Sequence, residues 1–170
     1  MSDHSLPKTI DPLKYADQSK VLEGQISQKA LERLREIVLE SEGDVEVKLE
    51  FGRDQQHLRV VKGHLSASLQ LKCERCLEPV LKQVESNFEL GIVLSDDQAK
   101  NLPGYYEPLL VEYDSMPVYE VVEEELILSL PMFAYHDDCK MRQIEEPQEF
   151  ESAPKKDNPF SVLTDLKLKK

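Results

Sequence analysis

Apolar and polar side chains alternate with a period of two through most of residues 45–94, and this pattern limits the possible folds more than any other feature of the sequence. Successive side chains of a strand point to opposite faces, so each alternating run predicts a strand with one buried face. Ser86 is the one polar residue among the predicted inward positions of the last run. The inward positions are Val45, Val47, Leu49 and Phe51, then Leu65, Ala67, Leu69, Leu71 and Cys73, then Val84, Phe88, Leu90, Ile92 and Leu94.

The second and third runs predict a long antiparallel hairpin. They follow each other directly, and strands that are consecutive in the chain usually pair, which places residues 73–79 at the hairpin tip. The first strand of this hairpin is expected to begin near Leu58. It contains Gly63, where we expect an interruption by a β-bulge.

Two stretches have the three- and four-residue spacing of an amphipathic helix. The first is predicted to begin at Ser27, whose hydroxyl can cap the free amides of a first turn. It is predicted to end at Gly43, because glycine adopts the left-handed conformation that closes many helices. The second ends at Pro131. Their apolar faces consist of Ala30, Leu31, Leu34, Ile37 and Val38, and of Tyr119, Val122, Leu126 and Leu130.

The remaining segments add short elements to this pattern. Strands are predicted at residues 21–26 and 109–113, a short helix at residues 95–102, and an extended arm along a sheet edge at residues 1–20. The predicted fold class is therefore α+β, with an antiparallel sheet that contains a long hairpin and is packed by two main helices.

Composition and spacing predict three parts. Residues 1–139 form a single α+β domain, and residues 140–157 are a polar, proline-punctuated stretch that predicts a disordered linker. Residues 158–170 predict a short basic helix, since Asn158 can cap it and Pro159 suits its first position. Only 40% of the chain is apolar, below the ~45–50% of an average globular protein, in agreement with a part that does not pack.

The charge balance excludes several function classes. The formal net charge is −12, and a surface of that sign does not release counterions from DNA or attach without help to RNA or to a membrane surface. No apolar run reaches the length of a membrane span, and the first residues lack a secretory signal pattern. Three cysteines without such a signal predict reduced thiols and a cytoplasmic protein.

Four landmarks follow one another along the chain: LPKTIDP at residues 6–12, LKCERCLEP at residues 71–79, EELILSLP at residues 124–131 followed by His136 and Cys139, and NPFSVL at residues 158–163. In this order they resemble the YceD-type large ribosomal RNA subunit accumulation proteins of bacteria. The resemblance implies a role in the synthesis, processing or stability of 23S ribosomal RNA, hence in the biogenesis of the large subunit, and it implies no known catalytic reaction.

Cys73 and Cys76 have the spacing of a knuckle that offers two thiolates to one zinc ion. His136 and Cys139 are the candidates for completing a Cys₃His set. Many relatives carry several further cysteines after the Leu-Pro segment, whereas this chain does not. Two alternatives stay open: three ordinary reduced thiols, or a redox pair, although a redox pair is expected beside a thioredoxin-like βαβ pattern that this sequence lacks.

Arg75 lies between the two cysteines of the knuckle. An arginine in a turn can bind an RNA phosphate through two parallel hydrogen bonds, or it can pair with a neighbouring carboxylate such as Glu74 or Glu78. Catalytic signatures are absent from the sequence, which has no phosphate-binding glycine-rich loop, nucleophile elbow or His-Glu-x-x-His helix, so no catalytic residue is predicted.

The charges are distributed unevenly along the chain. Residues 101–139 hold nine acidic residues and no lysine or arginine, whereas residues 155–170 hold five lysines against two aspartates. The acidic stretch predicts either a solvated face or a surface for a basic protein, and the lysine-rich end is the candidate for RNA phosphate. The predicted contact residues of this end are Phe160, Val162, Leu163, Leu166, Lys167, Lys169 and Lys170.

These observations lead to one main hypothesis and one alternative. The main hypothesis is a non-enzymatic biogenesis factor whose partner is 23S ribosomal RNA or a precursor of the large subunit. The alternative is an acidic interaction module or chaperone for a basic ribosomal protein, which affects the RNA only indirectly.

Overall fold

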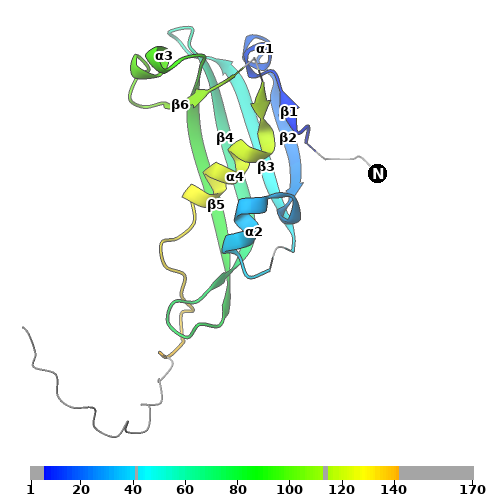
Figure 1. Cartoon of the computed structure of the whole chain (residues 1–170), viewed down its shortest axis with the longest axis vertical. Coiled ribbons are helices and arrows are strands. Elements are labelled where there is room, and N and C mark those ends of the chain that lie inside the picture. Colours follow the sequence, from blue (N-terminus) through cyan, green and yellow to red (C-terminus); the bar gives the residue numbers. More distant parts are fainter. Residues whose placement is uncertain (1–5, 41, 113–114, 142–170) are drawn as a thin grey trace, which may run out of the picture.

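The computed structural model describes residues 6–40, 42–112 and 115–141, and in this part of the chain the fold is α+β with mostly strands, as predicted (Figure 1). Its main sheet has five strands in the order β2-β3-β4-β5-β6. Neighbouring strands are antiparallel except β6, which is parallel to β5, so the prediction of a wholly antiparallel sheet is wrong at this edge. The strands are β2 (Val21–Ser27), β3 (Asp44–Arg53), β4 (Arg59–Lys72), β5 (Pro79–Val93) and β6 (Glu107–Leu110).

The strands β4 and β5 are the longest of the sheet, and they pair without interruption as far as Lys72 and Pro79. The bulge expected near Gly63 is absent, because Gly63 pairs directly with Phe88 in a regular register. The ring of Phe88 lies over the Gly63 backbone and occupies the place that a Cβ would need. Glycine at this position makes room for an aromatic ring and does not bend the strand.

Helices α2 (Glu32–Ile37) and α4 (Val118–Leu128) lie on the same face of the sheet (Figure 1). Glu123 of α4 is 6% exposed, and its Oε1 accepts a hydrogen bond of 3.0 Å from the backbone N–H of Leu34 in the first turn of α2. It does so because the N-cap residue of α2, Leu31, has no side chain that accepts hydrogen bonds. The core between the layers includes Leu34, Val122 and Leu126 from the helices and Val47, Leu49, Leu65 and Leu69 from the sheet.

The helix predicted over residues 27–43 is mostly replaced by other structure. Ser27 ends strand β2 and caps nothing, a 3₁₀ turn follows at Gln28–Ala30, and α2 has only six residues. The chain leaves the helix at Val38, and the N–H of Leu39 donates to the carbonyl of Gln70 in β4 at 2.8 Å. After Val38, backbone hydrogen bonds to the sheet thus replace helical hydrogen bonds. The periodicity of the sequence does not reveal this competition between the helix and the sheet. Among the described residues α4 is the one long helix, so the expectation of two main helices is not confirmed.

The segment predicted as an extended arm is partly folded. Thr9–Ile10 (β1) pairs with Met116–Pro117 (β7) in a separate two-stranded sheet, and helix α1 (Pro12–Asp17) follows. Asp11 caps α1 by accepting a hydrogen bond of 3.0 Å from the Lys14 N–H. The short helix predicted near residue 95 is present as α3 (Asp96–Lys100), capped by Ser95.

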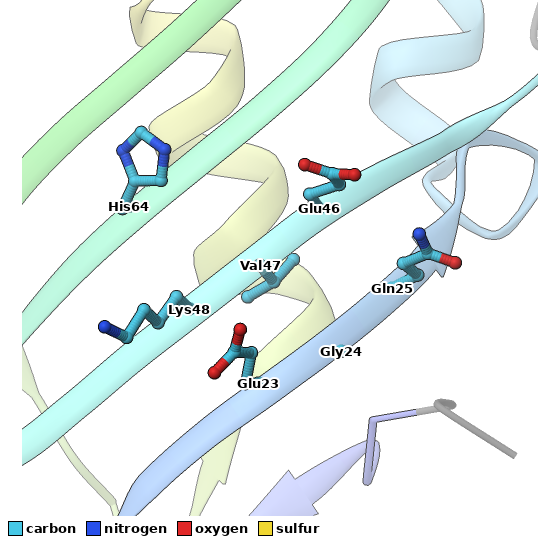
Figure 2. A pocket seen from close by; sticks show the side chains of 7 residues that line it. All are labelled: Glu23, Gly24, Gln25, Glu46, Val47, Lys48 and His64. Carbon is cyan, nitrogen blue, oxygen red and sulfur yellow. The ribbon is translucent and has the colours of Figure 1, made fainter. Parts of the chain in front are cut away.

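The face of the sheet that turns away from α2 and α4 is polar. Glu23, Glu46, Lys48 and His64 project from β2, β3 and β4 on this side, with α4 visible behind the sheet (Figure 2). In the part of the chain that the structure describes, no helix combines the length and the apolar character needed to cross a membrane. The predicted linker, from residue 142 on, and the predicted terminal helix lie outside the described residues.

Candidate metal centre

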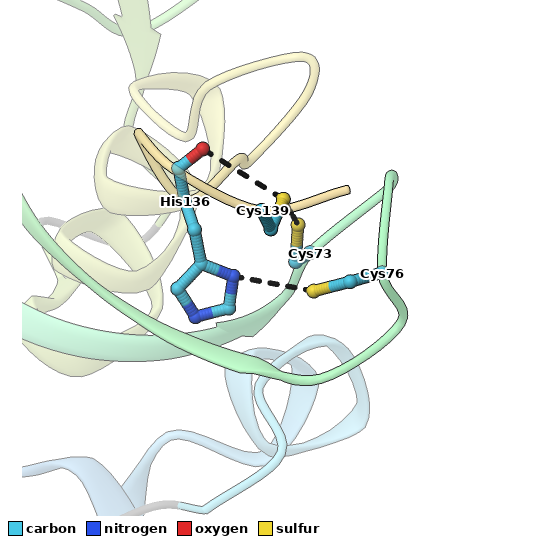
Figure 3. Close-up of side chains that lie close together, drawn as sticks. All are labelled: Cys73, Cys76, His136 and Cys139. Carbon is cyan, nitrogen blue, oxygen red and sulfur yellow. Dashed lines mark hydrogen bonds between the residues drawn. The ribbon is translucent and has the colours of Figure 1, made fainter. Parts of the chain in front are cut away.

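The turn between β4 and β5 places two thiols on the same side of the hairpin tip (Figure 3). The turn is closed by two backbone hydrogen bonds of 2.9 Å, from the Leu77 N–H to the Cys73 carbonyl and from the Cys73 N–H to the Glu78 carbonyl. Leu77 takes a positive φ of 65°, which lets the chain reverse into β5. Cys73 is fully buried and Cys76 partly exposed, so the two sulfur atoms lie at the boundary between the core and solvent.

The chain after α4 brings the other two candidate ligands to this turn. Pro131 follows the end of the helix, and the segment then runs along the hairpin to its tip (Figure 1). The carbonyl of Ala134 accepts a hydrogen bond of 2.9 Å from the Glu74 N–H, which fastens the segment to the turn. His136 and Cys139 follow within a few residues and face Cys73 and Cys76 (Figure 3).

The ligand atoms of Cys73, Cys76, His136 and Cys139 all lie within 4.8 Å of one another. The Sγ atoms of Cys73 and Cys139 are 3.5 Å apart, and Cys76 Sγ is 3.3 Å from His136 Nδ1. Tetrahedral zinc with Zn–S bonds of ~2.3 Å requires sulfur–sulfur separations of about 3.8 Å. The four side chains are therefore spaced as one small ion of this coordination requires.

The imidazole of His136 is oriented for coordination through Nδ1. Its Nε2 lies 2.9 Å from the carbonyl oxygen of Pro79, and because a carbonyl only accepts hydrogen bonds, Nε2 carries the proton. The lone pair of the neutral ring is then on Nδ1, the atom that faces Cys76. Histidine ligands of metals commonly donate their second ring nitrogen to a carbonyl or carboxylate in this way.

Two of the thiols, Cys73 and Cys76, have pKa values shifted in opposite directions. Burial raises the pKa of the Cys73 thiol, but hydrogen bonds from the Cys76, His136 and Arg75 backbones and from the His136 ring outweigh it and lower the pKa to about 5. The backbone of Glu78 lowers the pKa of Cys76, but burial and the neighbouring Cys73 and Cys139 thiols raise it by more. The site therefore favours the thiolate of Cys73 and disfavours a second thiolate at Cys76. A bound cation would offset the repulsion between the negatively charged sulfur atoms.

Arg75 stabilises the segment that carries the last two ligands. Its Nη1 donates a hydrogen bond of 3.0 Å to the carbonyl of Cys139, and its guanidinium lies 5.3 Å from the centre of the Tyr135 ring. No described carboxylate forms an ion pair with it, neither Glu74 nor Glu78. Arg75 therefore links the turn to the segment that carries His136 and Cys139, a contact that the sequence did not suggest.

The structure thus brings together the four predicted ligands and places Arg75 beside them, while the seven predicted contact residues of the C-terminal end, from Phe160 to Lys170, lie outside the described residues. Sequence reasoning missed three groups: the Pro79 carbonyl that orients His136, the Ala134 carbonyl, and the Tyr135 ring. Backbone carbonyls carry no sequence signal. The only available hint for Tyr135 was its position next to a predicted ligand.

Comparison with known proteins identifies a clear relative. The family model described as "Large ribosomal RNA subunit accumulation protein YceD" matches residues 61–167. A protein of Haemophilus influenzae with the same description is 37% identical over 174 aligned positions, which cover 99% of this chain and all of the relative. No solved structure matches the chain.

Proposed function

The chain belongs to the YceD family of large ribosomal RNA subunit accumulation proteins, and from this we propose that it acts in the cytoplasm as a non-enzymatic biogenesis factor of the large ribosomal subunit. In this role it supports the synthesis, processing or stability of 23S ribosomal RNA. The observation that carries the proposal is the identity of 37% over nearly the whole chain to a relative described by this role.

Deletion of the gene tests the proposal. We expect a lower level of 23S ribosomal RNA and fewer complete large subunits on sucrose gradients, with both restored when the wild-type chain is supplied. Unchanged 23S levels together with a normal gradient profile in the deletion strain would contradict the proposal.

A second candidate function is favoured by the charge of the molecule. With a net charge of −12, the protein has the sign that attracts basic ribosomal proteins and repels RNA. It would then act as an interaction module or chaperone for such a protein. Capture with the tagged chain separates the two: a ribosomal protein retained after nuclease treatment favours the second function, and nuclease-sensitive capture of 23S RNA favours the first.

A catalytic role in RNA processing is the outcome that would most change this view. Carboxylates are plentiful in the chain, but no arranged metal-binding set of carboxylates occurs among the described residues. We expect purified protein to leave precursor ribosomal RNA intact in the presence of Mg²⁺ or Mn²⁺. Cleavage under these conditions would replace the non-enzymatic proposal with a nuclease.

We further propose that Cys73, Cys76, His136 and Cys139 bind one structural zinc ion. The support is the chemistry of the donor set, in which three thiols and an imidazole with an oriented lone pair lie within 4.8 Å. Four protein ligands leave no open coordination position, so the ion would link the hairpin tip to the segment after α4 and would not activate a water molecule.

Metal content tests this part directly. Purified protein should carry about one zinc ion per chain, and Cys76→Ser should lose it, whereas His64→Ala, which removes an exposed histidine on the open face of the sheet, should not. Replacement of zinc by Co²⁺ gives a second measurement, because cobalt–thiolate coordination produces a characteristic absorption spectrum. Zinc-free protein with no cobalt–thiolate absorption would contradict the zinc proposal.

The lysine-rich end is proposed to make the RNA or partner contact. Residues 155–170 have the basic surplus that the rest of the chain lacks, with Lys167, Lys169 and Lys170 close together in sequence. We expect deletion of residues 155–170 to abolish complementation of the deletion strain and to leave the thermal unfolding of the protein nearly unchanged. Full complementation by the shortened chain would contradict this role, as would a large loss of thermal stability.

A further inference from the structure

A groove runs between helix α4 and the edge strand β6, on the face of the sheet that carries the helices. It has a volume of about 340 Å³ and a largely apolar floor. Strand β6 pairs only with β5 among the described strands, so the groove lies at the edge of the sheet, where backbone groups are available to a partner. The apolar lining comes from Leu90, Pro108, Leu109, Val121, Ile127 and Leu128.

The groove remains uncovered by any described part of the chain. Leu128, at the end of α4, lines the groove and is 75% exposed. Met132 and Phe133, in the segment that follows the helix, are 87% and 57% exposed. Exposed apolar side chains beside a groove are typical of a docking site.

The rim of the groove is acidic. Glu107, Glu124 and Glu125 line it together with Arg33, whose Nη1 is 3.0 Å from Glu124 Oε1. Glu107 and Glu125 have no ion-pair partner among the described residues. Burial raises the pKa of Glu125, and the negative charges of Glu107 and Glu124 raise it further. Among the described residues, the apolar floor is therefore bordered by two carboxylates, Glu107 and Glu125, that no cation pairs with.

We propose that this groove binds a segment of a basic protein in which lysine or arginine side chains flank an apolar side chain. The apolar side chain would pack on Leu109, Val121 and Leu128, and a cation would lie between Glu107 and Glu125. The arrangement combines a desolvated apolar centre with a charged rim, as specific interfaces do. The inference deepens the proposed function, since the basic proteins encountered during large-subunit biogenesis are ribosomal proteins.

The same features disfavour the other occupants. An RNA strand would bring phosphates next to Glu107 and Glu125, which costs electrostatic free energy and releases no counterions. A second copy of the chain would carry the same acidic rim, and a two-fold interface places each surface against itself. The net charge of −12 adds to that repulsion.

The test uses the full chain and a fluorescently labelled synthetic peptide in which arginine and lysine alternate with leucine. Binding is followed by fluorescence anisotropy. We expect Leu128→Ser, and separately the double variant Glu107→Gln with Glu125→Gln, to weaken binding about tenfold, corresponding to about 1.4 kcal/mol. A peptide with serine in place of leucine should bind weakly to every variant. The substituted side chains are exposed or half-buried, so thermal unfolding should stay close to wild type.

Matched controls lie elsewhere on the molecule. Leu81→Ser changes an exposed leucine of the hairpin, which is 68% exposed, and Glu23→Gln with Glu46→Gln removes two carboxylates from the open face of the sheet (Figure 2). These variants should bind the peptide as the wild type does. If the substitutions in the groove and those on the open face weakened peptide binding equally, the effect would come from non-specific charge and the inference would be overturned. Absence of peptide binding to the wild type would also overturn it.

Two further outcomes would assign the groove to a different occupant. Displacement of the peptide by a single-stranded RNA oligonucleotide, with RNA binding lost in Leu128→Ser, would make it an RNA site. A dimer in light scattering that Leu128→Ser converts to a monomer would make it a contact between copies. The peptide measurement is independent of the deletion strain. A normal 23S level in that strain together with specific peptide binding would contradict the proposed function but support the groove as a binding site. A reduced 23S level without specific peptide binding would contradict the groove proposal alone.

Discussion

The two ends of the long sheet are held together by different chemistry. At the hairpin tip, Leu77 and Leu81 are exposed, and three thiols and an imidazole from two distant segments lie within 4.8 Å of one another. At the opposite end, α1 packs on the sheet through Tyr15, whose ring meets that of Phe51 edge-on at a centroid distance of 5.4 Å. Phe51 is only 4% exposed.

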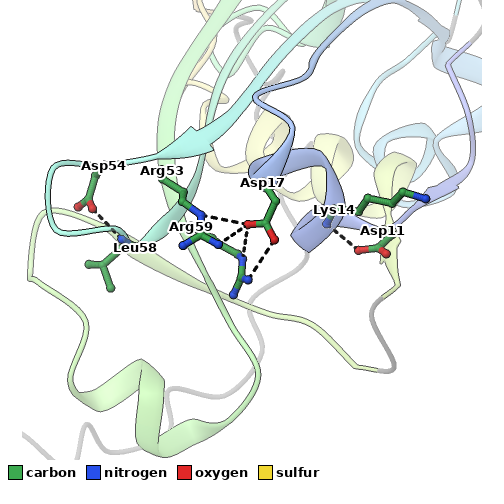
Figure 4. Close-up of polar contacts among 7 residues, drawn as sticks. All are labelled: Asp11, Lys14, Asp17, Arg53, Asp54, Leu58 and Arg59. Carbon is green, nitrogen blue, oxygen red and sulfur yellow. Dashed lines mark hydrogen bonds and ion pairs between the residues drawn. The ribbon is translucent and has the colours of Figure 1, made fainter.

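The α1 end is held by packing of aromatic side chains, whereas the tip is linked through polar side chains. The α1 end also carries an ion-pair cluster in which Asp17 Oδ1 accepts hydrogen bonds from the guanidinium groups of Arg53 and Arg59, at 2.7 Å and 2.8 Å (Figure 4). These groups are well exposed, and exposed ion pairs contribute little to stability. The α1 end therefore depends on its aromatic core, whereas at the tip, on the zinc proposal, the four candidate ligands join the hairpin to the segment after α4.

On the zinc proposal, the largest effect should come from removing the metal from the tip. Because zinc bound by four protein ligands is a main contributor to the stability of small metal sites, a strong chelator should lower the local stability of the tip by about 5 kcal/mol or more. Amide hydrogen exchange should accelerate in residues 72–79 and 134–139 and stay slow in β3. Uniformly unchanged exchange would mean that the tip is held by other contacts.

Phe51→Ala is the corresponding experiment at the α1 end. Loss of a buried aromatic ring should reduce the free energy of unfolding by about 3–5 kcal/mol. Leu81→Ala at the tip removes a large apolar side chain that is 68% exposed, and it should change stability by less than about 0.5 kcal/mol. Urea unfolding of both variants measures the two changes in the free energy of unfolding. Equal losses in the two variants would contradict the difference between the two ends of the sheet.

Arg75→Lys should have an intermediate effect confined to the tip. Lysine keeps the charge but loses the planar guanidinium that contacts both the Cys139 carbonyl and the Tyr135 ring. We expect a loss of about 1–2 kcal/mol from the free energy of zinc binding, measured by competition with a chromophoric chelator. Arg35→Lys, at an exposed position of α2, is the control and should leave zinc affinity unchanged.

The smallest effect should come from Asp17→Asn at the α1 end. Hydrogen bonds from Arg59 and then Arg53 lower the pKa of Asp17 to about 2, below its value of ~3.9 in an unfolded chain. The carboxylate therefore stabilises the folded state above about pH 4, and this contribution is lost as the pH falls through about 2. Thermal unfolding should differ slightly between wild type and Asp17→Asn at pH 7 and coincide once the pH is well below 2. A difference that persists there would assign the effect to packing instead of charge.

Local patterns predicted the elements whose structure depends on their own residues. Alternation over residues 45–94 predicted strands with the observed inward faces except at Leu94, which follows β5 and is 47% exposed, and Ser95 marked the start of α3. The failures lie where distant backbone groups compete. Val38 and the residues after it leave the helix because Leu39 bonds to Gln70, and Gly63 sits in a regular strand because Phe88 covers it.

In the candidate metal site, too, some features follow from local sequence and others from contacts between distant residues. The spacing of Cys73 with Cys76, and of His136 with Cys139, identified two half-sites, because each pair lies on a short stretch of chain. That the two halves meet depends on the hydrogen bond between Glu74 and Ala134, which joins residues sixty positions apart. The groove between α4 and β6 had no sequence signal beyond its acidic residues.

By itself, the sequence determined which faces of the strands are buried, which residue types are available as ligands, and where acidic and basic charge are concentrated along the chain. Each of these follows from the side chains and from the two-residue or 3.6-residue repeat of the local backbone. Only the tertiary structure decided that β6 lies parallel to β5, that His136 turns its Nδ1 towards the thiols, and that Leu128 stays exposed beside an acidic rim. These features depend on hydrogen bonds and packing between residues far apart in the chain, whose pairing no local repeat encodes.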